Sequence, residues 1–284
     1  MLPCRTRCSL AMLALFAFFP AASRSAETAT GVVELAPHRA IYDLKLGQSR
    51  GKRGLEGVRG RILYDFEGSR CEGYALQFRQ VTELESGEGE NVLSDLRTSN
   101  WEEGNGESFR FTVQNYLGGR EIDGSDGLAG RGDNGVSVSL TKPEKKKAQL
   151  GAVIFPSEHM RRVIEAAREG KTLLEAAVFD GSETGEKVYN TLTVIGHAIA
   201  PEQAPPKDAA AGQASLAHLT RWPVTVSYFD RANADQSGEQ TPAYAISFEL
   251  YENGVSRALK IDYGDFVVTG DMTSLDMKMA KPCK

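Results

Sequence analysis

Residues 156–170 read PSEHMRRVIEAAREG, and they form the segment of the chain with the clearest helical pattern. Apolar side chains recur there at intervals of three and four residues, which places them on one helix face: Met160, Val163, Ile164 and Ala167. Ser157 is expected to cap the start of this helix, and Gly170 to end it with a left-handed backbone conformation. Because nearly all of the flanking sequence predicts strands, the apolar face of the helix is expected to pack on a sheet.

The flanking sequence alternates apolar and polar residues, as half-buried antiparallel strands do. Turn residues such as Asn253-Gly254 separate the segments. The pattern predicts thirteen strands: 39–46, 61–66, 71–84, 91–101, 109–113, 136–140, 173–179, 187–197, 222–230, 244–250, 256–263, 265–269 and 274–279. The glycine-rich residues 118–135 are predicted to be mostly loop with two or three very short strands, and the basic residues 145–147 to be a solvated turn.

A chain of so many hairpins predicts one long antiparallel sheet, and twisted sheets curl or close beyond about ten strands. We therefore predict a mainly β protein whose single principal helix lies on the concave side of the curled sheet. Met160, Val163 and Ile164 would each contribute about 1.5–3 kcal/mol to stability when buried there. Residues 200–215 (APEQAPPKDAAAGQAS) carry no alternation, and they are predicted to be a flexible loop within one domain rather than a linker.

The N-terminal 25 residues have the features of a cleaved signal peptide. Arg5 and Arg7 precede the apolar run 10–19, and small residues follow with cleavage expected after Ser23 or Ser25. Ten apolar residues are too few for a membrane-spanning helix, which needs about 20. Without this segment the net charge falls from −5 to −8, because it holds three arginines and no acidic residue. A periplasmic location is predicted, with no membrane span in residues 26–284, and the negative charge argues against nucleic-acid binding.

Cys71 and Cys283 are the cysteines that remain after residue 25. In an oxidising compartment they are expected to pair with each other, although buried free thiols or a bond to a partner protein are the alternatives. An intramolecular bond would close a loop over nearly the whole mature chain. The chain-entropy formula gives about 5 kcal/mol of stabilisation for such a loop, as an upper figure.

A search for catalytic, metal and cofactor motifs in the sequence is mostly negative. No nucleophile elbow, zinc-protease helix or phosphate-binding loop is present. The histidines are scattered, and the acidic segment with Asp123, Asp126 and Asp133 lacks the ligand spacing of a calcium loop. Neither a metal nor a cofactor is therefore predicted. Four carboxylates could supply a catalytic pair, but the sequence offers no means to choose among them: Glu72, Glu102, Glu103 and Asp180.

Ten aromatic residues occupy the alternating faces of the predicted strands: Tyr42, Tyr64, Phe66, Tyr74, Phe78, Phe109, Phe111, Tyr228, Tyr244 and Phe248. Packing in the core is the simpler interpretation of these residues. The alternative is that part of this face lines an apolar groove for an acyl chain or a peptide, since curled sheets often bind ligands in their open ends.

Several long blocks of the sequence resemble the EipB family of alphaproteobacterial periplasmic cell envelope integrity proteins. The blocks are APHRAIYDLKL at 36–46, GRILYDFEGSRCEGYALQFR at 60–79, KPEKK at 142–146, FPSEHM at 155–160, VFDGS at 178–182, WPVTVSYFD at 222–230 and YENGVSRALKIDYGDF at 251–266, with Cys283 at the end. The resemblance covers the whole mature chain, apart from the variable residues 200–215.

The resemblance implies a periplasmic protein folded as an open, spiral β-barrel that a helix partly plugs, with a disulfide between Cys71 and Cys283. It also implies a role in envelope integrity and stress resistance and a link to a periplasmic tetratricopeptide-repeat protein. The family's open barrel looks like that of outer-membrane lipoprotein carriers, and no catalytic residues are assigned to it. The resulting hypothesis is a non-enzymatic protein that binds a lipid, a lipoprotein acyl chain or a protein partner. The alternatives are a structural interaction protein without a cavity and an envelope hydrolase with an unrecognised site.

Overall fold

The computed structural model describes residues 31–50, 55–86, 91–203, 206–233 and 240–280. The signal peptide and Cys283 lie outside these ranges. The described residues contain fourteen strands in one sheet, one α-helix and two short 3-10 helices. The elements are β1 (His38–Ser49), β2 (Leu55–Ser69), β3 (Gly73–Ser86), β4 (Asn91–Glu102), β5 (Ser108–Leu117), β6 (Arg120–Gly132), β7 (Gly135–Lys142), β8 (Lys146–Gly151), α1 (Pro156–Arg168), β9 (Leu173–Val178), β10 (Tyr189–Ile195), η1 (Ala209–Gly212), β11 (Arg221–Asp230), η2 (Arg231–Asn233), β12 (Tyr244–Tyr251), β13 (Ser256–Asp262) and β14 (Phe266–Met277).

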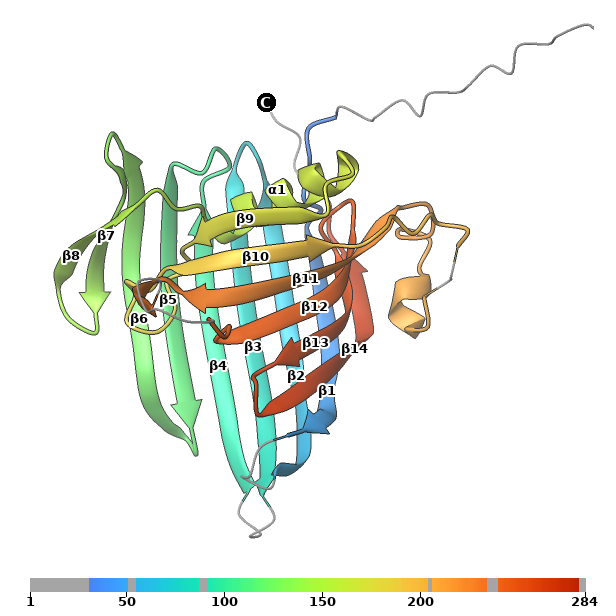
Figure 1. The fold of residues 1–284 in the computed structure, drawn as a ribbon, viewed down its shortest axis with the longest axis horizontal. Coiled ribbons are helices and arrows are strands. Elements are labelled where there is room, and N and C mark those ends of the chain that lie inside the picture. The colour runs from blue at the N-terminus through green and yellow to red at the C-terminus, as the bar shows by residue number, and fades with distance from the viewer. Residues whose placement is uncertain (1–30, 51–54, 87–90, 204–205, 234–239, 281–284) are drawn as a thin grey trace, which may run out of the picture. The chain divides into compact units, whose positions relative to one another are not determined.

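The sheet consists of two meanders joined in its middle. Its strand order is β8-β7-β6-β5-β4-β3-β2-β1-β14-β13-β12-β11-β10-β9, so β1 and β14 are neighbours, and all neighbouring strands are antiparallel. In Figure 1 the strands β9–β13 cross in front of β2–β4. Residues from both groups line one internal cavity, so the two halves of the sheet face each other. The predicted mainly β fold with a curled antiparallel sheet is thus confirmed.

The curled sheet is not closed into a barrel. Its edge strands β8 and β9 meet only through the segment after β8, where Ile154 forms a single parallel bridge with Val178. The Ile154 N–H donates to the Ala177 carbonyl at 2.8 Å, and the Phe179 N–H donates to the Ile154 carbonyl at 3.0 Å. This seam is packed with aromatic rings, since the Phe109 ring stacks on Phe155 with centroids 5.1 Å apart.

Helix α1 lies inside the curl, with its apolar stripe on the sheet as predicted. Val163 and Ile164 are 2% and 0% exposed and pack with core residues such as Phe66 and Trp222. The predicted C-terminal end is also confirmed, because Gly170 has φ of +73° and the Lys171 N–H bonds to the Ala166 carbonyl.

The predicted N-terminal cap of α1 is wrong. The N-cap residue is Phe155, which has no capping side chain, and Pro156 begins the helix. Ser157 therefore lies inside the first turn, where its backbone N–H needs an acceptor from elsewhere in the fold. Glu102 of β4 supplies that acceptor.

Residues 118–135 also differ from the prediction, because they contain the continuous strand β6 rather than mostly loop. The glycines there serve close packing: a Cβ at Gly127 would lie 2.9 Å from the Phe111 ring and 3.0 Å from Leu140. The predicted turn at 145–147 is mostly the start of edge strand β8, whose exposed lysines are typical of edge strands. The two predicted C-terminal strands are the single strand β14.

The part of residues 200–215 that the structure describes includes the 3-10 helix η1, which packs on the sheet. Ala210 and Ala211 are buried beside β14, and Gln213 donates from its side-chain amide to the Leu275 carbonyl at 2.7 Å. The neighbouring Asp208 forms an ion pair with the buried Arg257 at 3.0 Å. A run of small alanines has no alternating pattern, so the sequence could not indicate this packing.

Candidate functional site

A cavity of about 630 Å³ lies inside the curled sheet. Its walls come from the inward-facing residues of both meanders and from one side of α1. The lining residues on the strands mostly alternate along the chain: His38, Tyr42, Ile62, Tyr64, Leu76, Phe78, Gln80, Leu96, Thr98, Asn100, Val113, Asn115, Asp123, Tyr189, Val226, Tyr228, Tyr244, Ile246, Phe248, Ser256, Leu259 and Ile261. The alternation of residues in the sequence thus identifies which side chains lie on the inner face of most strands, and this face is largely apolar or aromatic.

The aromatic residues singled out in the sequence divide between the two interpretations. Those that line the cavity are Tyr42, Tyr64, Phe78, Tyr228, Tyr244 and Phe248. Those that pack in the solid core are Phe66, Tyr74, Phe109 and Phe111, each at most 5% exposed. The interior is therefore filled by packed side chains near the seam and beneath the helix, while the other group of aromatic residues borders open space.

The three helix residues predicted as a groove or plug occupy two environments. Met160 and Val163 line the cavity, and Met160 is only half-buried. Ile164 is fully buried in the core behind them. The helix thus forms a wall of the cavity and leaves the space beside it open.

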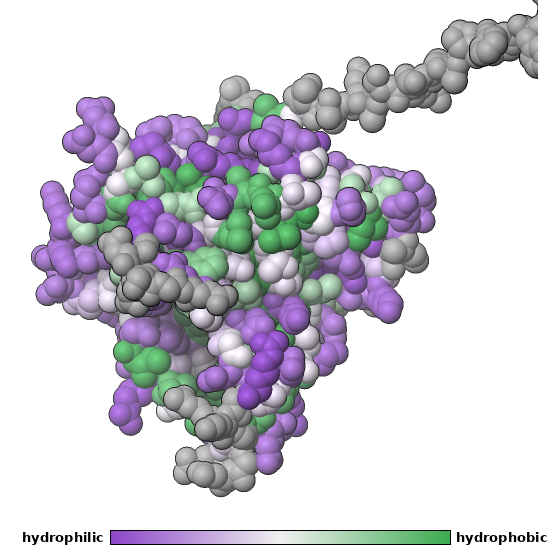
Figure 2. Space-filling model, in the orientation of Figure 1, coloured by the Kyte–Doolittle hydropathy of each residue, from purple (hydrophilic) through white to green (hydrophobic). Residues whose placement is uncertain are grey.

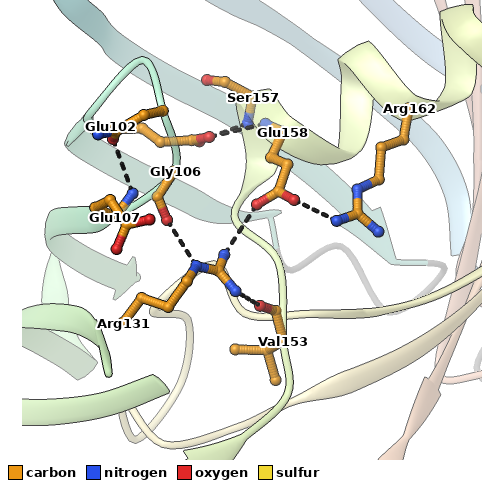
Figure 3. Close-up of polar contacts among 9 residues, drawn as sticks. Glu102, Gly106, Glu107, Arg131, Val153, Ser157, Glu158 and Arg162 are labelled. Atoms are coloured by element: carbon orange, nitrogen blue, oxygen red, sulfur yellow. Dashed lines mark hydrogen bonds and ion pairs between the residues drawn. The ribbon is translucent and has the colours of Figure 1, made fainter. Parts of the chain in front are cut away.

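A carboxylate from the sheet holds the N-terminus of α1 (Figure 3). The Ser157 N–H donates to Glu102 Oε2 at 2.6 Å, and the Glu158 N–H donates to Glu102 Oε1 at 2.8 Å. Glu102 is 2% exposed, and it satisfies two of the N–H groups that a helix start leaves without partners. A carboxylate there also interacts favourably with the helix dipole.

Arg131 of β6 links the same helix end to the turn between β4 and β5 and to the segment before α1 (Figure 3). Its guanidinium donates to the Gly106 carbonyl at 3.1 Å, to the Val153 carbonyl at 3.2 Å and to Glu158 at 3.0 Å. Glu158 also pairs with Arg162 one helical turn further on. Neither this arginine nor Glu102 could be linked to the helix from the sequence, because both depend on contacts between distant strands.

Two buried groups at this end of the helix, Glu102 and His159, have pKa values that are shifted in opposite directions. Burial raises the pKa of Glu102 to about 7, although the two backbone N–H donors and Arg161 act against it. Burial lowers the pKa of His159 to about 4, with the Arg162 charge acting in the same direction. His159 is neutral near pH 7, and its Nε2 has no hydrogen-bond partner within the described residues.

Acidic and tyrosine side chains gather at one part of the cavity wall, just beyond β9. Asp180 lines the cavity, and its Oδ1 accepts the Ser182 N–H at 2.9 Å. Burial raises the pKa of Asp180, and burial also raises the pKa values of Tyr228 and Tyr244, with the Asp180 charge acting in the same direction. Asp180 follows Val178, which pairs with Tyr189, and the Tyr189 ring contacts those of Tyr228 and Tyr244. Glu183 accepts the Tyr189 hydroxyl at 2.8 Å and pairs with Lys187 at 2.6 Å.

The four carboxylates considered in the sequence have separate surroundings. Glu102 caps the helix, Glu103 accepts the Ser108 hydroxyl at 3.0 Å, and Asp180 faces the cavity. Glu72 lies in the turn between β2 and β3. The hydrogen-bond partners of Glu102, Glu103 and Asp180 are different groups: the start of α1, Ser108 and Ser182.

Neither a metal site nor a membrane-spanning helix is found where the chain is described. No cluster of three or more histidine, cysteine or acidic side chains has a geometry suited to a metal ion within those ranges. The helical segments there are too short or too polar to cross a bilayer. Cys71 lies in the turn between β2 and β3, and its pairing with Cys283 stays a prediction because Cys283 is outside the described residues.

The fold and its interior define a class of protein. In this class a long antiparallel sheet curls around an apolar cavity, and its two edge strands do not pair to close a barrel. The EipB-like family model matches residues 29–279, and the chain belongs to this family. It is 36% identical over 260 residues to the cell envelope integrity protein EipB of Brucella abortus (strain 2308), across 92% of this chain and 90% of that protein. The predicted family is therefore confirmed.

A solved structure supports the same assignment. The crystal structure of a beta-barrel-like protein with a domain of unknown function from Brucella abortus has a TM-score of 0.79 and 34% sequence identity. The match covers 87% of this chain and 100% of that one. Identity at this level, together with the TM-score, indicates the same fold.

Proposed function

We propose that this protein maintains cell envelope integrity and stress resistance in the periplasm by holding an acyl chain of a lipid or lipoprotein inside its curled sheet. The observation that carries the proposal is the cavity of about 630 Å³. Cavities that bind small molecules fall mostly between about 300 and 1,000 Å³ and are lined by apolar and aromatic side chains. The general role rests on the likeness to the Brucella abortus cell envelope integrity protein.

The lining favours a chain over a compact polar molecule. Leu76, Ile246 and Leu259 come from three different strands and offer aliphatic contacts around the space. Each methylene group transferred from water into such surroundings contributes about 0.8 kcal/mol. Several methylene groups would be needed to offset the loss of freedom on binding, which costs at least about 4 kcal/mol.

We further propose that the protein is not an enzyme. Glu102 has the kind of raised pKa that often marks a catalytic acid, but both of its carboxylate oxygens accept backbone N–H groups of α1. Structural hydrogen bonding explains its burial without a reaction. The tetratricopeptide-repeat partner implied by the family resemblance stays a prediction.

Ligand binding can be tested with a pair of neighbouring substitutions on β4. Thr98 lines the cavity, whereas Ser99 faces the opposite side of the strand and is exposed. Thr98→Trp should fill part of the cavity and weaken binding of a fluorescently labelled fatty alcohol, which carries no charge, at least about tenfold, or 1.4 kcal/mol. Ser99→Trp should leave that affinity unchanged.

Native mass spectrometry of the protein purified from periplasm adds an independent measurement. We expect a bound mass that is released by organic solvent and is reduced in Thr98→Trp. Consistently empty protein that also fails to bind the fluorescent fatty alcohol would overturn the proposal. Equal binding by both tryptophan variants would place the ligand outside the cavity and would also contradict it.

A further inference from the structure

The carboxylates that line the cavity have no lysine or arginine beside them in the lining, within the described part of the chain. No lysine or arginine belongs to the lining there, whereas three carboxylates do: Asp123, Asp180 and Glu183. An apolar cavity that carries negative charge and no positive charge disfavours an anionic ligand group, because like charges repel strongly where water is excluded.

Asp180 is the carboxylate that the protein itself compensates least. Glu183 is paired with Lys187, and Asp123 is exposed and accepts the Asn115 amide at 3.1 Å. Asp180 accepts hydrogen bonds from Ser182, including its backbone N–H at 2.9 Å, and no lysine or arginine of the described residues forms an ion pair with it. Asp180 is half-buried and faces an apolar cavity, and a carboxylate placed there without a neighbouring cation is costly. This position is therefore suited to a positive group supplied by a ligand.

The neighbouring tyrosines strengthen this preference. The rings of Tyr228 and Tyr244 stack with centroids 4.5 Å apart, and the Tyr189 ring lies edge-on to both at 5.8 and 5.7 Å. All three line the cavity. Aromatic rings beside a carboxylate are the groups that proteins use to bind ammonium ions, including quaternary ones.

We propose that the cavity selects an amphiphile with a cationic head group, whose ammonium lies beside Asp180, Tyr228 and Tyr244 while its chain contacts the aliphatic wall. This inference rests on the proposed function, because it specifies the head group of the ligand held there. The negative charge of the lining, and the absence of an ion pair to Asp180 among the described residues, favour this occupant over a phosphate- or sulfate-bearing one.

Three amphiphiles share a twelve-carbon chain and differ in the charge of the head group: dodecyltrimethylammonium, dodecyl maltoside and dodecyl sulfate. Differences among their affinities therefore report on the head group alone. Each is titrated into the full mature protein below its critical micelle concentration, and heat or intrinsic fluorescence is recorded. We expect dodecyltrimethylammonium to bind at least about tenfold more tightly than dodecyl sulfate, a difference of 1.4 kcal/mol. Dodecyl maltoside should bind with intermediate affinity.

Two isosteric variants distinguish the effect of the cavity carboxylate on amphiphile affinity from the effect of the net charge of the protein. Asp180→Asn should reduce the affinity ratio of dodecyltrimethylammonium to dodecyl sulfate about tenfold. Glu165→Gln removes one negative charge from the exposed face of α1, where the structure gives its side chain no ion pair, and should leave the ratio unchanged.

The outcomes distinguish this inference from the proposed function. Dodecyl sulfate binding as tightly as dodecyltrimethylammonium, or the same ratio in Asp180→Asn as in the parent, would overturn the cationic preference. Maltoside binding that Thr98→Trp weakens would still support a chain in the cavity. Absence of binding by all three amphiphiles would overturn both proposals. The parent comparison needs no variant, so a poorly folded Asp180→Asn protein would not prevent the test.

Discussion

The carboxylate of Glu102 lies 2.6 Å from the backbone nitrogen of Ser157, so a strand of the sheet caps the helix that packs inside it. Glu102→Ala would remove the acceptor of two buried N–H groups, and we expect it to lower the free energy of unfolding by about 1–3 kcal/mol. Urea unfolding followed by circular dichroism measures this change. Glu103→Ala, which removes only the Ser108 contact, is the matched control and should cost less than half as much.

The pKa values of Glu102 and His159 predict opposite pH dependences of stability. Glu102 titrates near 4.5 when unfolded and near 7 when folded, so its contribution is full below pH 4.5 and is lost as the pH rises to about 7. His159 titrates near 6.5 when unfolded and near 4 when folded, so its contribution is full above pH 6.5 and is lost as the pH falls to about 4. The two trends largely cancel in the parent between pH 4.5 and 6.5.

Single variants should reveal each trend. On lowering the pH from 7 to 4.5, the stability of the parent relative to Glu102→Gln should rise, by at most about 1.4 kcal/mol per pH unit. From pH 6.5 to 4, the stability of the parent relative to His159→Gln should fall. Differences that do not change with pH in chemical unfolding curves would contradict these assignments.

The helix residues Ile164 and Met160 should respond differently to truncation. Ile164→Ala leaves a hole in a closely packed core and should destabilise the protein by about 2–5 kcal/mol. Met160→Ala enlarges an existing cavity, so its cost in thermal or urea unfolding should be smaller. Equal losses for the two variants would show that the helix does not divide the filled core from the open space.

Two glycines of β6 provide a test of close packing. A Cβ at Gly127 would lie 2.9–3.0 Å from Phe111, Leu140 and a backbone oxygen, whereas one at Gly130 would meet nothing within 4 Å. Gly127→Ala should therefore lower stability by about 1–3 kcal/mol. Gly130→Ala should be neutral or slightly stabilising, because it restricts the unfolded chain. The melting temperatures of the two variants should diverge accordingly.

The disulfide between Cys71 and Cys283 is a further prediction. Cys71→Ser or Cys283→Ser should lower the melting temperature under oxidising conditions only, with about 5 kcal/mol as the upper limit of the effect. A parent protein that melts at the same temperature with and without reductant would refute the bond. Mass spectrometry of peptides from non-reduced protein would identify the pairing directly.

The fold was predictable from the sequence wherever side chains alternate or recur with the helical period. Phe78 and Ile246, for example, lie on the inner face that their alternation predicts. The prediction of secondary structure failed where one sequence pattern, such as a run of glycines, can arise for two different physical reasons. The glycines near Gly127 indicated a loop, although glycine is also the residue that fits where strands and aromatic rings come very close.

The site was less predictable, because its defining features arise from contacts between distant segments. Asp180 and Tyr244 are far apart in the sequence, and only the curl of the sheet places both on one cavity wall. Ser157 has a capping side chain by type, yet the cap comes from Glu102 on another element. Local pattern carries no information about such pairings.

The pairing of β1 with β14 means that the centre of the sheet can form only after the C-terminal strand is available. His38 pairs with Met277, so the ladder at the centre of the sheet joins nearly the first described residue to nearly the last. Such long-range contacts cannot form while the chain is still emerging, and proteins dominated by them fold slowly. Until the C-terminal strand arrives, the inner face of β1 and β2 stays exposed to solvent and to other chains. A truncation of β14 would therefore damage the middle of the sheet rather than its edge, because β1 would lose the strand that pairs with it.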